Sequence, residues 1–130
     1  MAIRVVLADD HPLFLAGLEA ALDREGLEIV GIAGSGEELI DVAGQVAPRV
    51  VLLDVAMPGM SGPDLQQELT RRRQAIPIVF ITAHGVRTAR PRLLAQGAAE
   101  CLFKPFSEAA LLDAVRAALR PPYRGPLTAT

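Results

Sequence analysis

The chain has 130 residues, enough for one domain that buries about two-thirds of the surface of its unfolded chain. Its single cysteine, Cys101, excludes an internal disulfide, and with only two histidines no Cys/His metal cluster can form. A net charge of −2 gives no general attraction to nucleic acid, and no apolar run approaches the ~20 residues that span a membrane. We therefore expect a cytoplasmic protein that binds neither DNA nor a membrane directly.

Short apolar runs alternate with helical patterns along the whole chain. The runs are rich in Val, Ile and Leu, which is typical of strands buried on both faces, and the segments between them place apolar residues at helical spacing. The predicted strands cover residues 3–8, 27–33, 50–53, 78–81 and 100–103. The predicted helices cover residues 13–25, a short stretch after Ser35, the stretch from Ser61 to the arginine run 71–73, about 90–96, and 108–120.

Local signals mark several helix ends. Gly26 is placed to stop the first helix, Ser35 and Glu38 have the spacing of a capping box, and Ser107 is placed to cap the last helix. Two prolines follow that helix, and the segment after them has no periodicity. We predict one domain over residues 1–120 and a flexible tail or severed linker over residues 121–130.

Five strand–helix units in strict alternation predict an α/β fold. The expected arrangement is a doubly wound, five-stranded parallel sheet with helices on both faces. In such a sheet every strand points the same way, so the residues that follow the strands share one rim, where ligands bind in open α/β folds. The polar residues at that rim are Asp9, Asp10, Asp54, Thr82 and Lys104.

This set of side chains suits a phosphoryl group held next to a divalent cation. Clustered carboxylates repel one another unless a cation neutralises them, and oxygen-only ligands favour a hard ion such as Mg²⁺ or Mn²⁺. Phosphoryl transfer needs mainly positioning and charge neutralisation, which a cation, a lysine and a threonine hydroxyl can supply. The residues alone therefore predict a phosphoryl-binding metal site.

The same residues, in this order and at these strand ends, resemble the site of the bacterial response-regulator receiver (CheY-like) domain. The resemblance extends over residues 3 to about 120. Segment 8–13, Ala-Asp-Asp-His-Pro-Leu, is similar to receivers that carry LuxR-type DNA-binding domains, whereas segments 54–62, 81–85 and 103–106 are more similar to the FixJ-like branch. The family implies a flavodoxin-like fold with strand order 2-1-3-4-5.

The resemblance also implies a role for each matching residue. Asp54 would accept a phosphoryl group from a phosphohistidine on a sensor histidine kinase or phosphotransfer protein, and then lose it by self-catalysed hydrolysis. Metal ligands would be Asp10, Asp54 and the backbone carbonyl of Ala56, with Asp9 acting through water. Phosphate-binding groups would be Thr82, Ala83 and Lys104, and the bond between Lys104 and Pro105 would be cis. The face built from segments 90–96, 100–103 and 108–120 would pass the signal to a downstream protein or a missing effector domain, and could also form a dimer.

Some positions depart from the family pattern. Cys101 stands where an aromatic side chain usually changes rotamer on activation, so we expect signalling to rest more on the loop after residue 82; as a structural residue, Cys101 would be a small buried hydrophobe. His84 could orient or block the water that hydrolyses the aspartyl phosphate, or be a plain solvated loop residue. His11 is expected to be an exposed residue at a helix start.

These residues favour three functions over a nucleotide-binding protein, for which no Gly-x-x-x-x-Gly-Lys-Ser/Thr loop is present. The first is a phosphorylation-dependent switch that acts through protein contacts. The second is the amino-terminal receiver half of a LuxR- or FixJ-type DNA-binding regulator. The third is a phosphatase with an aspartyl-phosphate intermediate, which is disfavoured because Ala56 occupies the place of the required second acid.

Overall fold

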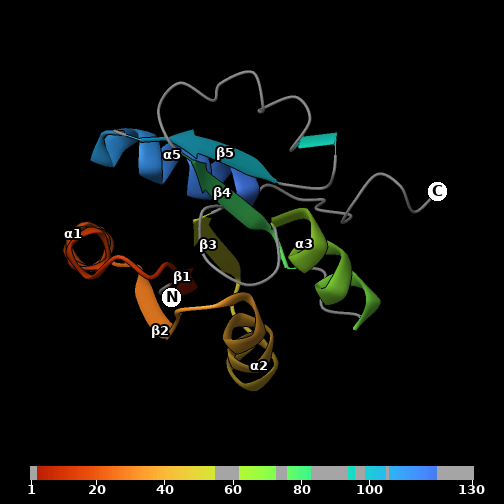
Figure 1. Cartoon of the computed structure of the whole chain (residues 1–130). Coiled ribbons are helices and arrows are strands. Elements are labelled where there is room, and N and C mark those ends of the chain that lie inside the picture. The colour runs from red at the N-terminus through yellow and green to blue at the C-terminus, as the bar shows by residue number, and fades with distance from the viewer. Residues whose placement is uncertain are drawn as a thin grey trace.

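The computed structural model describes residues 3–54, 62–72, 76–82, 94–95, 99–104 and 106–119. Five strands form one parallel sheet, in the order β2-β1-β3-β4-β5 (Figure 1). This order confirms the expected flavodoxin-like arrangement. The strands are β1 (Arg4–Ala8), β2 (Glu28–Ala33), β3 (Val50–Asp54), β4 (Ile78–Thr82) and β5 (Glu100–Phe103).

Helices cover both faces of the sheet, because residues along each strand alternate between the two faces. Leu22 of one helix and Val115 of another pack on the face that carries Val5 and Leu7, whereas the opposite face receives leucines from the two other helices, Leu39 among them. The first pair is α1 (Pro12–Arg24) and α5 (Glu108–Ala118), and the second is α2 (Gly36–Val46) and α3 (Gly62–Arg71).

The predicted helix ends are present, with one change of partner. Gly26 follows α1 with a left-handed φ of 76°, and the Ser107 hydroxyl accepts a hydrogen bond from the Ala110 N–H at 3.0 Å. The Ser35 hydroxyl accepts from the Glu38 N–H at 3.2 Å, but the Glu38 carboxylate accepts from the N–H of Gly34 rather than of Ser35. The capping box therefore closes one residue earlier than the simple pattern predicts.

Pairing between the strands brings their carboxyl ends to one rim. Ala8 pairs with Leu53 and Asp54 with Ile81, so β1, β3 and β4 end side by side. Asp54 and Thr82 are the last residues of β3 and β4, whereas the sequence predicted that each would be the first residue after its strand. The rim that was inferred from the alternation of elements is thus present.

Several predictions fall outside the described residues. They concern the helix near residues 90–96, of which only residues 94–95 are described, with the signalling and dimer face that includes it, and the tail over residues 121–130. Within the described part of the chain, no helix combines the length and the apolar character needed to cross a bilayer.

Candidate functional site: an acidic cluster at the sheet rim

Three carboxylates converge where β1 and β3 end. Asp9 and Asp10 follow β1 directly, and Asp54 is the last residue of β3. One ligand atom from each lies within 4.8 Å of the others, together with a nitrogen of His11. Asp9 and Asp54 are only 2% exposed, whereas the Asp10 side chain is 38% exposed. Two of the three carboxylates are thus almost fully shielded from solvent.

Lys104 supplies a positive charge from the other side of the cluster. Its ammonium Nζ donates to Oδ2 of Asp54 at 3.3 Å, and its side chain is 29% exposed. The backbone places it, because the N–H of Lys104 donates to the carbonyl of Thr82 at 2.8 Å. Thr82 is itself 5% exposed at the end of β4, the strand next to Asp54. All five rim residues therefore lie at adjacent strand ends, and Lys104 contacts the central carboxylate directly.

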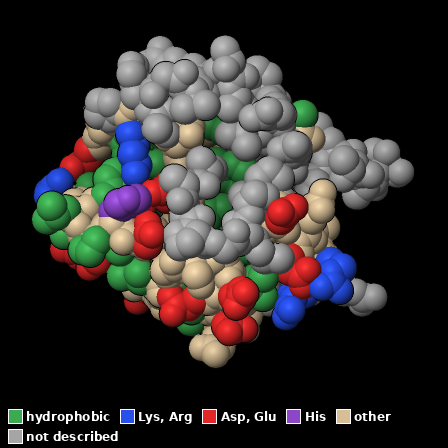
Figure 2. Space-filling model, in the orientation of Figure 1, with side chains coloured by type: hydrophobic (Ala, Val, Ile, Leu, Met, Phe, Trp, Pro, Cys, Tyr) green, Lys and Arg blue, Asp and Glu red, His purple; other side chains and the backbone are tan. Residues whose placement is uncertain are grey.

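His11 belongs to the cluster, although the sequence indicated only an exposed helix start. It is the N-cap of α1, and its backbone N–H donates to Oδ1 of Asp9 at 2.8 Å. This turn brings the ring back over the rim, where Nδ1 lies 3.0 Å from Asp9, 3.3 Å from Asp10 and 3.4 Å from Asp54. In Figure 2 a histidine side chain (purple) lies on the surface beside acidic side chains (red). The side chain is 58% exposed at the start of α1, as predicted, and the contacts of its ring with the three carboxylates were not predicted.

The carboxylates perturb the imidazole in turn. A side-chain hydrogen bond to Asp9, and then the charge of Asp10, raise the pKa of His11 above its usual value. The signal that could have found this residue is its position directly after two acids, at a chain reversal where a short Asp side chain can accept from the backbone two residues on.

The acidic cluster fits a divalent cation. One oxygen of Asp9, Oδ2, is buried and has no hydrogen-bond partner among the described residues. A buried carboxylate oxygen without a partner is costly, and a cation would satisfy it. Asp9, Asp10 and Asp54 could hold such an ion, and carboxylate oxygens are the donors that Mg²⁺ and Mn²⁺ accept.

Other predicted site residues divide into two groups. Cys101 is 7% exposed on β5 and packs in the core on the side of α2 and α3, as expected for a small buried hydrophobe. Ala56, Ala83, His84 and Pro105 lie outside the described residues.

Comparison with known proteins places the chain in a family. The family described as "Response regulator receiver domain" matches residues 5–116. This chain is a member of the response-regulator receiver family. It is 40% identical over 116 residues to the transcriptional regulatory protein PdtaR of Mycobacterium tuberculosis, covering 89% of this chain and 56% of that one. To the response regulator GacA of Pseudomonas viridiflava it is 39% identical, covering 88% of this chain and 54% of the other.

A solved receiver has the same fold. The signal receiver domain of a protein described as the response regulator NarL from Mycobacterium tuberculosis superposes with a TM-score of 0.84 at 31% identity, covering 92% of this chain and 98% of that domain. The receiver described here thus spans a little over half of the length of curated relatives, and nearly all of a solved receiver domain. The acidic cluster and Lys104 lie within the matched segment.

Proposed function

We propose that this receiver accepts a phosphoryl group on Asp54 from a phosphohistidine of a sensor kinase or phosphotransfer protein. The observation that carries the proposal is the environment of Asp54, a carboxylate that is 2% exposed beside two further acids and 3.3 Å from the Lys104 ammonium. A carboxylate that only capped a strand end would not need that surrounding set. Membership of the receiver family, a family of signalling switches, also favours a phosphoacceptor over an aspartyl phosphatase.

The proposed chemistry is one transfer and one hydrolysis. In the transfer, an oxygen of Asp54 attacks phosphorus, the bond from phosphorus to the histidine nitrogen breaks, and the released imidazole keeps its electron pair and takes up a proton. In the hydrolysis, a water oxygen attacks phosphorus, the bond from phosphorus to the Asp54 oxygen breaks, and inorganic phosphate, a proton and the free Asp54 carboxylate result. Both steps need charge neutralisation and alignment rather than a separate protein nucleophile, so the domain would catalyse them itself.

Each rim residue takes a part in this proposal. Asp9, Asp10 and Asp54, with the backbone carbonyl of Ala56, would hold Mg²⁺ or Mn²⁺, which when bound neutralises the negative charge that gathers on the transferred group. Lys104 would bind a phosphoryl oxygen, because its ammonium already lies beside the acceptor. Thr82 and the backbone of Ala83 would bind the other oxygens.

Signal output is proposed to follow from the phosphoryl contacts of Thr82. Because Cys101 offers no ring to rotate, the shift would involve the loop after β4, where His84 would modulate hydrolysis, and Pro105 would set the path after Lys104. Nuclear magnetic resonance of the phosphorylated domain should show that loop shift, and unchanged loop resonances would contradict this route.

A donor protein could approach over α1. Leu13, two positions after His11, is 91% exposed, and it lines a cavity of about 270 Å³ between α1 and the start of α5. Family membership also favours a cytoplasmic location for this exchange. The receiver would then act on a separate protein or an attached effector domain.

The direct test is phosphorylation by a small donor. The protein is incubated with Mg²⁺ and acetyl phosphate, and its intact mass is measured with and without a chelator. We expect one added phosphoryl group that requires the metal, that is absent in Asp54→Ala, and that is retained in Asp41→Asn, which changes an exposed aspartate on α2. No added mass in the wild type, or addition that survives Asp54→Ala, would overturn the proposal.

A second candidate is the receiver half of a DNA-binding regulator. It is favoured by one observation, namely that the chain spans little more than half of the length of relatives, one of which is named a transcriptional regulatory protein. Sequencing the gene beyond codon 130 tests it. An open frame that encodes a DNA-binding domain would support this candidate, and a stop codon would exclude it.

A further inference from the structure

The Lys104 ammonium lies between a carboxylate and the face of an aromatic ring. Its Nζ is 3.3 Å from Oδ2 of Asp54 and 3.9 Å from the centroid of the Phe14 ring. Phe14 lies in the first turn of α1, and Lys104 follows β5, so the fold joins residues that are ninety positions apart. A cation over a ring face at this distance makes a favourable electrostatic contact with the negative face of the ring.

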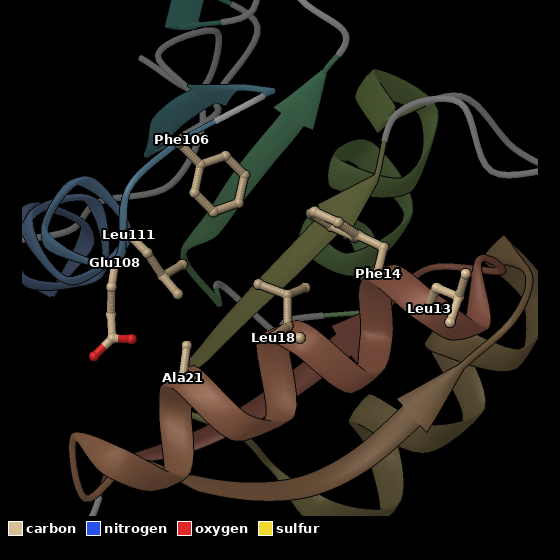
Figure 3. Close-up of a pocket in the computed structure, with 8 residues that line it drawn as sticks. Leu13, Phe14, Leu18, Ala21, Phe106, Glu108 and Leu111 are labelled. Carbon is tan, nitrogen blue, oxygen red and sulfur yellow. The ribbon is translucent and has the colours of Figure 1, made fainter.

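A second ring fixes the orientation of the first. Phe14 and Phe106 meet edge to face, with centroids 5.9 Å apart and planes at 88°. This is a preferred geometry for aromatic pairs, because the positive edge of one ring meets the negative face of the other. Both rings come from elements that flank the site, and they line the cavity between α1 and α5, together with Leu18 (Figure 3).

The aromatic contact restricts a flexible side chain. Lysine has four rotatable bonds and a strongly hydrated head, so an exposed lysine samples many orientations. Here the ring takes the place of water on one side of the ammonium, while the Asp54 carboxylate occupies another side. These two contacts hold Nζ at the rim where the phosphoryl group would bind.

We propose that Phe14 is a positioning residue for Lys104, a role that rests on the phosphoacceptor function proposed above. It holds the ammonium close to Asp54 before the donor arrives, so that less ordering is needed during transfer. The residue acts through Lys104 and does not touch the reacting atoms.

The first measurement compares variants with acetyl phosphate and Mg²⁺. Phe14→Leu keeps an apolar side chain but removes the ring face, and it should slow phosphorylation about two- to fivefold. Phe14→Tyr keeps the face and should restore the rate. Phe103→Leu removes another half-buried ring, which packs on the opposite side of the sheet, and should leave the rate unchanged.

Two further measurements separate positioning from a general structural effect. Fluorinated phenylalanines at position 14 weaken the negative face while keeping the ring shape, so the rate should fall with each added fluorine. In the Lys104→Met background, Phe14→Leu should cause no additional loss, because the contact is already gone. The ring should also shift the proton resonances of the Lys104 ε-methylene upfield, and that shift should vanish in Phe14→Leu.

The outcomes are distinct. If the wild type is not phosphorylated, the proposed function fails, and the role of Phe14 fails with it. If the wild type is phosphorylated and Phe14→Leu is equally fast, or if Phe14→Leu slows the Lys104→Met protein by the same factor, only the positioning role is overturned.

Discussion

Replacing Asp9 with asparagine should make the metal-free protein more stable while weakening its response to Mg²⁺. Asp9 is 2% exposed, and its carboxylate lies within 4.8 Å of ligand atoms of Asp10 and Asp54. Two like charges at that separation repel by about 3.5 kcal/mol at an effective dielectric constant near 20. Asparagine keeps an oxygen that can accept from the His11 N–H, so the turn after β1 is retained.

The net gain is smaller than the repulsion. Part of the repulsion is already offset by Lys104, which lies 3.3 Å from Asp54, and by the imidazole of His11, which lies 3.0 Å from Asp9. We therefore expect Asp9→Asn to raise the free energy of unfolding by about 1–2 kcal/mol in a chelator. A ligand at one hundred times its dissociation constant stabilises the native state by about 2.7 kcal/mol, and the variant should gain clearly less than the wild type from Mg²⁺.

Urea denaturation with chelator or with excess Mg²⁺ measures both effects, and Asp41→Asn on α2 is the matched control. That control should change neither the metal-free stability nor the increment caused by Mg²⁺. A metal-free Asp9→Asn protein that is less stable than the wild type would refute the repulsion argument. An unchanged Mg²⁺ increment would refute the placement of the cation at Asp9.

Three further predictions concern the fold around the site. A Cβ on Gly31 would lie 2.6 Å from Cγ1 of Val42, so Gly31→Ala should destabilise the protein by about 1–3 kcal/mol in urea denaturation, and Val42→Ala should restore much of that loss. Ala47 ends α2 with a left-handed φ of 45°, which is strained for a residue with a Cβ. Ala47→Gly should therefore raise the free energy of unfolding by about 0.5–1 kcal/mol, measured from the urea denaturation midpoint. An unchanged midpoint would contradict strain at this position. Hydrogen bonds from Arg71 and then Arg72 lower the pKa of Glu68 from 4.5 to about 2, so the carboxylate stabilises the fold above pH 4.5 and this contribution is lost as the pH falls towards 2. The stability difference between the wild type and Glu68→Gln should therefore shrink through that pH window, and a constant difference would exclude this linkage.

Much of the molecule follows from local sequence. The strand–helix alternation, the Ser35 and Ser107 caps and the Gly26 stop are present, because a hydrophobic period and a capping side chain act over only a few residues. The same alternation predicted which carboxylates share a rim, since parallel strands all end on one side.

Contacts that depend on the direction of a side chain were harder to predict from the sequence. His11 was predicted to be a plain helix start, but the turn after β1 returns its ring to three carboxylates. Phe14 packs partly buried against the core beneath α1, and its ring also lies 3.9 Å from the Lys104 ammonium. The position of His11 after two acids is the only sequence signal for its contacts, and the contact of Phe14 with Lys104 has no sequence pattern, because it depends on a side-chain direction rather than on a spacing.

The sequence by itself determined the order of the elements, their buried faces and the polar residues at the ends of β1, β3, β4 and β5, all charged except Thr82. Only the tertiary structure decided how those charges are paired: which carboxylate Lys104 contacts, which oxygen of Asp9 is left buried, and which ring lies under the ammonium. The physical reason is the separation along the chain over which each effect acts. Periodicity and capping are properties of neighbours along the chain, whereas the pairing of buried charges depends on strand register and on the rotation of α1 against the sheet, which are set by packing across the whole domain.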